Sequence, residues 1–245
     1  MRVQCTLHCK ELPITYHMLF VSLIKKCLET SDQEYYQKLY YYDGKKNKQS
    51  KNFTFAVFLK DYQLEGDSFE IRGQVDLFVS SPDPEWMIHF YNGLLRQKDF
   101  QYQGIQLAKG RVRVLNEKTT FDDPFMVCQT LSPLYIKDRE NRPVSPSDPT
   151  FQHELNYITN LNLKNYRGFG LRSELSLTPL DMKKVVVKDA IHQQQEEKQR
   201  SYLFLEGYKG KFLLQGHPED LQTLYQLGIG FRRSSGWGMI EVIQP

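Results

Sequence analysis

The sequence predicts an α+β protein made of two tandem ferredoxin-like domains, each with the element order β-α-β-β-α-β. Two observations lead to this prediction. The hydrophobic pattern of residues 1–118 follows that order, and the order recurs in residues 122–245. In addition, residues 84–92 and 218–226 both begin with Pro-Glu and place a tyrosine and an amide residue after five further residues. Each repeat falls on the second helix of its half, which favours a duplication.

The first half begins with alternating apolar and polar side chains over residues 3–7, which is typical of a strand. After Pro13, apolar residues recur every three or four positions, as expected for an amphipathic helix. Two apolar segments, residues 53–59 and 69–79, follow and are predicted to be strands. These elements supply the first strand, the first helix and the second and third strands of a ferredoxin-like domain.

The second helix of this half is expected to start in residues 81–85, where prolines and acidic side chains occupy the first turn. Residues 105–107 and 112–114 then alternate like a strand. The phase of the alternation changes across Gly110, so we expect a β-bulge or a tight turn there.

The second half shows a comparable series after the polar segment 117–124, which is the expected domain boundary. The predicted elements are a strand at 125–136, a proline-rich loop at 137–149, a helix from 151, extended segments at 169–177 and 185–187, a polar hairpin tip at 193–200, a strand at 202–214 broken by Gly207 and Gly210, a helix from Pro218, and a final strand at 239–243.

The composition excludes two classes of protein. Fifteen Phe, 15 Tyr and 2 Trp are too many aromatic residues for a chain that stays disordered. The longest apolar stretches fall far short of the roughly 20 residues that cross a bilayer, so no membrane partner is expected. The net charge of +3 is too small to decide for or against a nucleic-acid partner, and the placement of the charges has to decide.

The four cysteines form no disulfide framework and the N-terminus carries no apolar signal segment, so we expect a reduced, cytoplasmic protein. Cys5, His8 and Cys9 lie close together, but their spacing does not match a zinc knuckle. Buried thiols on a strand are the preferred interpretation, and no metal or other cofactor is predicted.

The most informative segment is residues 228–239, which we call the glycine segment. It contains four glycines, two arginines and two serines, and it lies between a helix and the last strand. The order helix–loop–strand excludes both a P-loop and a dinucleotide fingerprint. Two interpretations remain open: the backbone amides and arginines bind phosphate groups, or the glycines form a tight turn that packs against a helix.

This glycine segment resembles the glycine-rich loop of the repeat-associated RNA-binding (RAMP) superfamily of CRISPR systems, and within it the Cas-six endoribonucleases. Weaker similarities follow in the same order along the chain: Leu12-Pro13 before an amphipathic helix, residues 51–55 with the pattern Lys-x-Phe-Thr-hydrophobic, and the Leu-Ser-Pro at 131–133. The resemblance implies tandem ferredoxin-like domains, as the element order indicates independently. It also implies metal-independent cleavage of precursor CRISPR RNA within the repeat by attack of a ribose 2′-OH, which leaves a 2′,3′-cyclic phosphate and a 5′-OH.

Such chemistry needs a base, an acid and cations around the crowded phosphorus. Many members of the family use a histidine in the short helix after the first helix, a tyrosine on the first helix and a lysine before the second strand. Lys51 matches the lysine, Lys25 best matches the tyrosine, and Tyr40 stands at the histidine position. Tyr40 is a departure, because a phenol is a poor base at neutral pH. The candidate catalytic residues are therefore Lys25, Lys26, Tyr40, Lys51 and, as a substitute base, His17.

Residues 38–51 hold five lysines against one aspartate, which suits attraction of phosphate groups. The candidate RNA-binding residues are those of the glycine segment and two lysines before it: Gly228, Gly230, Arg232, Arg233, Ser234, Ser235, Gly236, Gly238, Lys209 and Lys211. The expected partner is CRISPR repeat RNA, with other CRISPR effector subunits and a homodimer left open. One alternative is a catalytically weak or inactive repeat-RNA-binding subunit of an effector complex, which the Tyr40 departure favours. Another is a tandem ferredoxin-like protein that binds other RNA or protein.

Overall fold

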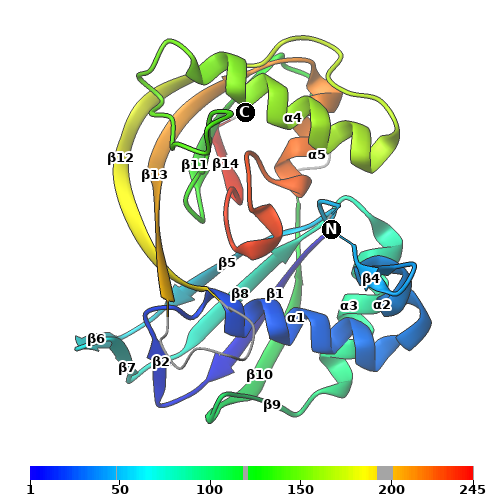
Figure 1. The fold of residues 1–245 in the computed structure, drawn as a ribbon, viewed down its shortest axis with the longest axis vertical. Helices are drawn as coiled ribbons and strands as arrows, with labels where there is room; N and C mark the ends of the chain where they lie inside the picture. The colour runs from blue at the N-terminus through cyan, green and yellow to red at the C-terminus, as the bar shows by residue number, and fades with distance from the viewer. Residues whose placement is uncertain (48, 118–120, 192–200, 245) are drawn as a thin grey trace.

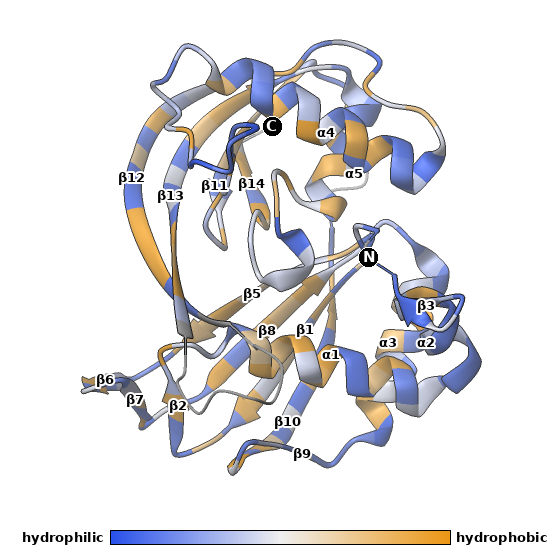
Figure 2. Cartoon of the chain, viewed as in Figure 1, coloured by the Kyte–Doolittle hydropathy of each residue, from blue (hydrophilic) through white to orange (hydrophobic). Residues whose placement is uncertain are grey.

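The computed structural model describes residues 1–47, 49–117, 121–191 and 201–244. The chain forms two lobes stacked one above the other, with the glycine segment descending between them (Figure 1). Hydrophobic residues concentrate on the central strands of the lower sheet and along the inner sides of the helices (Figure 2). Among the described residues, no helix combines the length and the apolar character needed to cross a membrane.

The lower lobe contains a sheet with the strand order β5-β8-β1-β10-β9. Its strands are β1 (Arg2–His8), β5 (Thr54–Leu59), β8 (Val75–Ser80), β9 (Asp99–Tyr102) and β10 (Ile105–Leu115). The helices α1 (His17–Ser31) and α3 (Pro84–Arg96) pack together and bury their apolar stripes against it. Four of the strands, β1, β5, β8 and β10, therefore lie in the order expected of a ferredoxin-like domain, with β9 added at one edge.

Three smaller elements complete this lobe. A short helix, α2 (Gln33–Tyr40), follows α1 directly and leads into the hairpin of β3 (Tyr41–Tyr42) and β4 (Lys45–Lys46). A separate sheet pairs β2 (Glu11–Pro13), β7 (Ser68–Ile71) and β6 (Tyr62–Glu65) in the order β2-β7-β6. The predicted strand over 69–79 is thus wrong as one element, because a turn divides it into β7 and β8, which belong to different sheets.

The expected bulge at Gly110 is confirmed. The register between β1 and β10 shifts between Cys5 and Leu7, opposite Gly110. A methyl group at this glycine would lie 2.9 Å from the ring of His8 and 3.1 Å from the carbonyl oxygen of Thr6. The glycine therefore allows the two strands to approach at the point where the alternation changes phase.

The upper lobe has the strand order β12-β13-β11-β14. Its strands are β11 (Phe125–Thr130), β12 (Ser176–Ile191), β13 (Ser201–Gln215) and β14 (Ile240–Gln244), and its helices are α4 (Phe151–Arg167) and α5 (Pro218–Leu227). Numbered within the lobe, this is the order 2-3-1-4, the same as for the four main strands of the lower lobe. The two lobes thus have matching topology, as the repeat of the Pro-Glu motif at the start of α3 and α5 predicts.

Three strand predictions in this lobe need correction. The first strand ends at Thr130 rather than at residue 136, and the segment 169–177 forms a strand only from Ser176. The third strand is continuous through Gly207 and Gly210, because these glycines accommodate close neighbours without breaking the ladder. A methyl group at Gly207 would lie 2.6 Å from the Trp237 ring. The predicted hairpin tip at 193–200 lies outside the described residues.

Each lobe has its own hydrophobic core. One core is built from residues between Val3 and Leu107 and the other from residues between Phe121 and Ile240. The predicted domain boundary near residues 118–122 falls between them in the chain, partly outside the described residues, and stays a prediction. Two separate cores are what a pair of tandem domains requires.

Arg2 joins the two lobes. Its guanidinium is 2% exposed, donates hydrogen bonds to the carbonyl oxygens of Tyr225 and Ile240, pairs with Glu241 at 2.7 Å, and lies 3.7 Å from the centre of the Tyr225 ring. Because Arg2 is on β1 and its partners are on α5 and β14, this cation fixes the first strand of one lobe to the last elements of the other. We call the contact region between the lobes the seam.

Candidate active site

Three of the predicted catalytic side chains converge in the lower lobe. The Nζ atom of Lys25, from α1, lies 4.9 Å from the centre of the Tyr40 ring, which ends α2. The Nζ atom of Lys51, from the segment before β5, lies 5.5 Å from the same centre. Both ammonium groups are within the range in which a cation is attracted to an aromatic ring. Residues from three successive segments of the chain therefore form one cluster, which we call the Lys–Tyr–Lys cluster.

The local hydrogen bonds explain how the chain holds this cluster. The side chain of Asp32 accepts a bond from the backbone N–H of Tyr35 and so starts α2, as an N-cap does. At the other end of α2, Asn47 donates its backbone N–H to the carbonyl oxygen of Tyr40 at 2.7 Å. The carbonyl oxygen of Asn47 accepts a 3.3 Å bond from Nζ of Lys51. Asn47 thus links the end of the helix to the lysine.

The environment shifts the pKa values of all three groups. Burial lowers the pKa of Lys51, and the positive charge of Lys25 lowers it further. Burial likewise lowers the pKa of Lys25, with a contribution from Lys46. Burial raises the pKa of the Tyr40 hydroxyl, and the neighbouring hydroxyls of Tyr36 and Tyr35 act in the same direction. Lowered lysine pKa values favour proton acceptance, and the raised tyrosine pKa keeps the phenol protonated.

The other two catalytic candidates lie elsewhere. Lys26 is 53% exposed and forms an ion pair with Glu29 on the same helix at 2.9 Å. His17 is the first residue of α1, eight residues before Lys25, which corresponds to about 12 Å along the helix axis. Its ring is buried against Tyr16 and Trp237 in the seam. The structure therefore separates Lys26 and His17 from the Lys–Tyr–Lys cluster.

The glycines of the glycine segment are buried and serve close packing. Gly228, Gly230, Gly236 and Gly238 all have positive φ angles, between 69° and 88°. A methyl group at Gly238 would overlap the carbonyl oxygen of Ile229, and one at Gly236 would lie within 3.0 Å of His17 and Phe55. Of the two interpretations, the packed turn describes the glycines themselves: they let the segment fold on itself and press against the lower lobe.

Adjacent arginines in this segment have opposite environments. Arg233 is 2% exposed and donates to the carbonyl oxygen of Leu227 at 2.8 Å, to the hydroxyl of Ser50 at 2.9 Å and to the side chain of Asn162 at 3.0 Å. Burial lowers its pKa to about 9. Arg232 is 38% exposed and lies 3.8 Å from Asp189. Arg233 is therefore not accessible to a phosphate group, because its donors are used inside the protein.

The remaining RNA-binding candidates are at least partly accessible. Lys209 and Lys211 are exposed on β13, and Ser234 and Ser235 are half-buried in the short 3-10 turn Arg233–Ser235.

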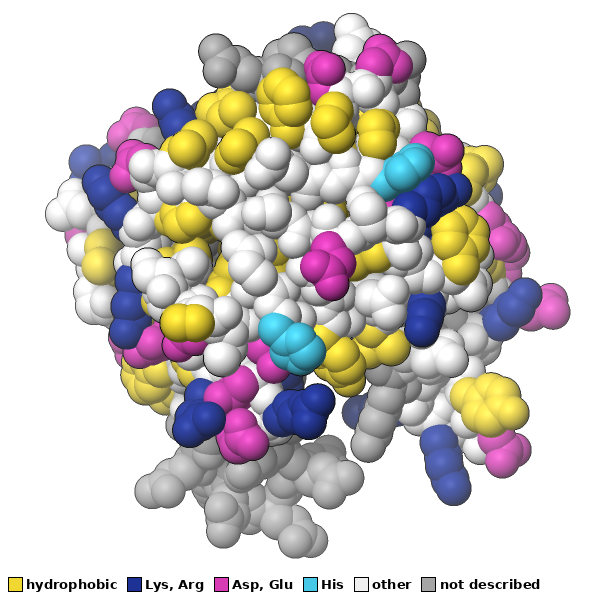
Figure 3. Space-filling view, turned by 90° about the horizontal axis from the view of Figure 1, so that it is seen from above, with side chains coloured by type: hydrophobic (Ala, Val, Ile, Leu, Met, Phe, Trp, Pro, Cys, Tyr) yellow, Lys and Arg dark blue, Asp and Glu magenta, His cyan; other side chains and the backbone are white. Residues whose placement is uncertain are grey.

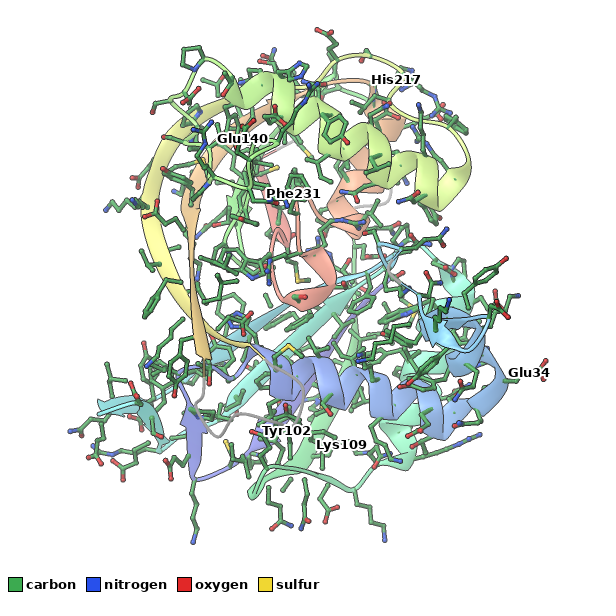
Figure 4. The ribbon with its side chains drawn as sticks, viewed as in Figure 1. Glu34, Tyr102, Lys109, Glu140, His217 and Phe231 are labelled. Atoms are coloured by element: carbon green, nitrogen blue, oxygen red, sulfur yellow. The ribbon has the colours of Figure 1, made fainter. Side chains whose placement is uncertain are left out.

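Phe231 lies on the segment between the lobes, whereas Lys109 and Tyr102 lie on the lower sheet (Figure 4). On the outer face of the upper lobe, the described Lys and Arg side chains are interspersed with Asp and Glu (Figure 3). The described side chains of that face therefore form no continuous positive patch for a polyanion.

Among the residues that the structure describes, no group of three or more His, Cys, Asp or Glu side chains is arranged to hold a metal ion. Cys5 is buried and Cys9 half-buried, and burial raises the pKa of both thiols. Cys5 on β1 is thus a buried strand thiol as predicted, whereas Cys9 lies after the end of β1 and is only half-buried.

Fold and topology define a tandem ferredoxin-like protein, and comparison with known proteins identifies the family. The family described as "CRISPR associated protein Cas6, C-terminal" matches residues 115–242, just over half of the chain. The chain therefore belongs to the Cas6 (Cas-six) family. A curated relative, CRISPR-associated endoribonuclease Cas6 1 of Methanocaldococcus jannaschii, is 21% identical over 247 residues, covering 95% of this chain and 88% of the relative.

Solved structures share the fold over the whole chain. A Cas6-related protein from Pyrococcus furiosus has a TM-score of 0.80 at 17% identity, with 99% of this chain and 98% of that chain covered. An RAMP protein that binds different RNA substrates has a TM-score of 0.79 at 19% identity, with both chains fully covered. A Cas6 product complex has a TM-score of 0.65 at 16% identity, with 98% of each chain covered. The fold prediction of tandem ferredoxin-like domains is thereby confirmed.

Sequence reasoning missed several residues that shape the site. Asn47 and Ser50 hold the segment before Lys51, Asn162 holds Arg233, and Trp237 covers His17. Ser50, Asn162 and Trp237 act through residues that are distant in the chain, and Asn47 acts through its backbone N–H and carbonyl oxygen. Local patterns carry no signal for such contacts, although the aromatic residue between two glycines at Trp237 marks that position as unusual.

Proposed function

We propose that this Cas6-family chain cleaves precursor CRISPR RNA once within the repeat, without a metal ion, by attack of a ribose 2′-OH on the adjacent phosphate. The observation that carries the proposal is the convergence of two lysines with lowered pKa values on one protonated tyrosine. Membership of the family supports endoribonuclease activity, since the curated relative is named an endoribonuclease.

In the proposed mechanism, Lys51 in its neutral form accepts the proton of the 2′-OH. The 2′ oxygen then attacks phosphorus, and the bond from phosphorus to the 5′ oxygen breaks. The products are a 2′,3′-cyclic phosphate and a 5′-OH. Lys51 is suited to this role because it is 7% exposed and its ammonium form is disfavoured by burial and by Lys25.

We assign the charge to Lys25 and the neutral form to Lys51, since the charge of Lys25 lowers the pKa of Lys51. The ammonium group of Lys25 stabilises the negative charge that develops on the non-bridging phosphate oxygens. The Tyr40 hydroxyl donates a proton to the departing 5′ oxygen, a role that its raised pKa permits because an alkoxide is a far stronger base than a phenolate. This cluster replaces the histidine that the family resemblance leads one to expect.

Repeat RNA is the proposed partner, and the accessible cations of the seam are the proposed contacts. Arg232, Lys209 and Lys211 are exposed and lie on the glycine segment and on β13. Participation of other effector subunits, a homodimer and a cytoplasmic location stay predictions from the sequence.

One assay tests the proposed function. Labelled CRISPR repeat RNA is incubated with the protein in EDTA, beside the same RNA carrying a 2′-deoxy nucleotide at the cut site. We expect cleavage of the first RNA and none of the second, with a cyclic phosphate on the upstream product. Cleavage of both RNAs would contradict attack by the 2′-OH. Tight binding of the repeat without cleavage would instead support a binding subunit.

A further inference from the structure

A small cavity of about 140 Å³ lies in the seam, apart from the Lys–Tyr–Lys cluster. Both lobes contribute to its wall. Residues from the lower lobe are Tyr16, His17, Phe55 and Val57, and residues from the upper lobe include Val185, Val187 and Lys209. We call it the seam cavity. Most of its lining side chains are apolar or aromatic, and few are polar, which is the composition of a pocket for a small flat ligand.

His17 is the unexplained polar group of this cavity. The side chain is 7% exposed, and its Nδ1 atom has no hydrogen-bond partner among the described residues. The imidazole is nearly parallel to the Tyr16 ring at 4.8 Å and to the Trp237 ring at 6.3 Å, with interplanar angles of 20° in both cases. A buried polar atom without a partner is uncommon in a native structure. His17 is therefore a buried polar side chain that also lines the seam cavity.

The size of the cavity limits what it holds. An apolar cavity of about 150 Å³ accepts one benzene molecule, so 140 Å³ matches a single six-membered ring better than a fused pair. A phosphate group is disfavoured among valine and phenylalanine side chains, because burial of an ion without full hydrogen bonding is costly. Unpaired RNA bases, by contrast, are commonly recognised by aromatic side chains together with hydrogen bonds to their edges.

We propose that the seam cavity binds one unpaired pyrimidine base of the RNA, with His17 as hydrogen-bond partner of the base edge and Lys209 as contact to the adjoining phosphate. This inference rests on the proposed function in assuming that the chain binds RNA. Lys209 fits its role because it lines the cavity and is also exposed to solvent. His17 and Lys25 lie on one helix, so a base held here fixes the position of the strand relative to the Lys–Tyr–Lys cluster.

The test uses hexamers of deoxyuridine, deoxycytidine and deoxyadenosine, and a hexamer with abasic sites. These probes lack the 2′-OH and therefore cannot be cut by the proposed mechanism, so binding is measured independently of cleavage. We expect fluorescence anisotropy to give the wild-type protein at least a fivefold lower Kd for one or both pyrimidine hexamers than for the purine and abasic hexamers. Equal affinity for all four hexamers would overturn the proposal.

Two neighbouring valines provide a matched pair of variants. Val185 lines the cavity, whereas Val186 is 56% exposed on the opposite face of β12. Val185→Phe fills the cavity and is expected to abolish the pyrimidine preference, and Val186→Phe is expected to retain it. His17→Ala should reduce the preference by removing the hydrogen bond. A preference that survives in Val185→Phe would count against the cavity.

A crosslinking measurement keeps the proposal testable if Val185→Phe fails to fold. A hexamer with one 5-iodouridine is irradiated with the wild-type protein, and the modified residue is identified by mass spectrometry. Crosslinks to Tyr16, His17 or Phe55 support the seam cavity, and crosslinks only elsewhere overturn it. Cleavage of repeat RNA is scored separately: a protein that cuts RNA but shows no base preference contradicts the cavity and leaves the proposed function intact.

Discussion

The guanidinium of Arg233 donates a 2.9 Å hydrogen bond to the hydroxyl of Ser50, the residue directly before Lys51. This contact joins the glycine segment of the upper lobe to the candidate active site of the lower lobe. The glycine segment contributes no residue to the Lys–Tyr–Lys cluster, but through Ser50 it holds the chain next to Lys51.

Arg233 and its neighbour Arg232 are expected to respond differently to replacement by alanine. Arg233→Ala leaves the Leu227 carbonyl and the Asn162 side chain without their donor, so the free energy of unfolding should fall by about 3 kcal/mol. Arg232→Ala removes one long ion pair of 3.8 Å to the buried Asp189 and should lower it by less, about 1 kcal/mol. Urea unfolding measures both. Arg232→Ala should nevertheless weaken RNA binding and make its salt dependence less steep.

Lys51→Ala is expected to slow cleavage of repeat RNA by about 100-fold or more, because a proton acceptor is lost. The affinity for RNA should change far less than the rate. Lys26→Ala, on the exposed face of α1, removes an ion pair with Glu29 and should leave the rate nearly unchanged. Single-turnover cleavage with separate measurement of Kd distinguishes the two lysines. Equal losses in both variants would show that charge alone, not the cluster, supports cleavage.

Tyr40→Phe is a test of the phenolic hydroxyl. The substitution retains the ring that lies beneath both ammonium groups and removes only the proposed proton donor. We expect about a tenfold or larger loss of cleavage rate with unchanged thermal stability. Tyr40→Ala should lose more of the cleavage rate, because the ring that contacts both ammonium groups is then absent as well. Full activity of Tyr40→Phe would limit Tyr40 to a positioning role.

The cleavage rate should rise with pH as Lys51 loses its proton, with the midpoint below the ordinary pKa of a lysine near 10.4. The charge of Lys25 contributes to this lowering, so Lys25→Met should raise the pKa of Lys51. The rising limb of the pH–rate profile is therefore expected at higher pH in the variant, in addition to a lower maximal rate. A loss of rate without displacement of the limb would indicate that Lys51 is not the base.

Gly238→Ala and Gly44→Ala compare two glycines with the same φ angle of 69°. No atom lies within 4 Å of a methyl group at Gly44, so this variant should lose about 1 kcal/mol through the unfavourable φ angle alone. The methyl group of Gly238→Ala also overlaps the Ile229 carbonyl oxygen, and we expect a loss of more than about 3 kcal/mol. Denaturant unfolding measures the free energy of unfolding of both variants. Similar losses in the two variants would contradict the predicted overlap at Gly238.

Much of the fold follows from local patterns. The apolar stripe of α1 and the Asp83-Pro84 start of α3 are readable because helical periodicity and capping involve residues within one or two turns. The bulge at Gly110 is readable for the same reason. The split of residues 69–79 into two strands is not, because the choice of partner strand depends on β2, far away in the sequence.

The sequence by itself determined the two ferredoxin-like halves, the glycine segment and the family resemblance, because these depend on residue type and short-range spacing. Only the tertiary structure decided which of two adjacent arginines is buried, that Lys25, Tyr40 and Lys51 meet, and that His17 lies apart from them. Burial and charge–charge distance arise when segments distant in the chain pack together. The same packing lowers the pKa values of the two lysines and buries the Nδ1 atom of His17 without a hydrogen-bond partner among the described residues.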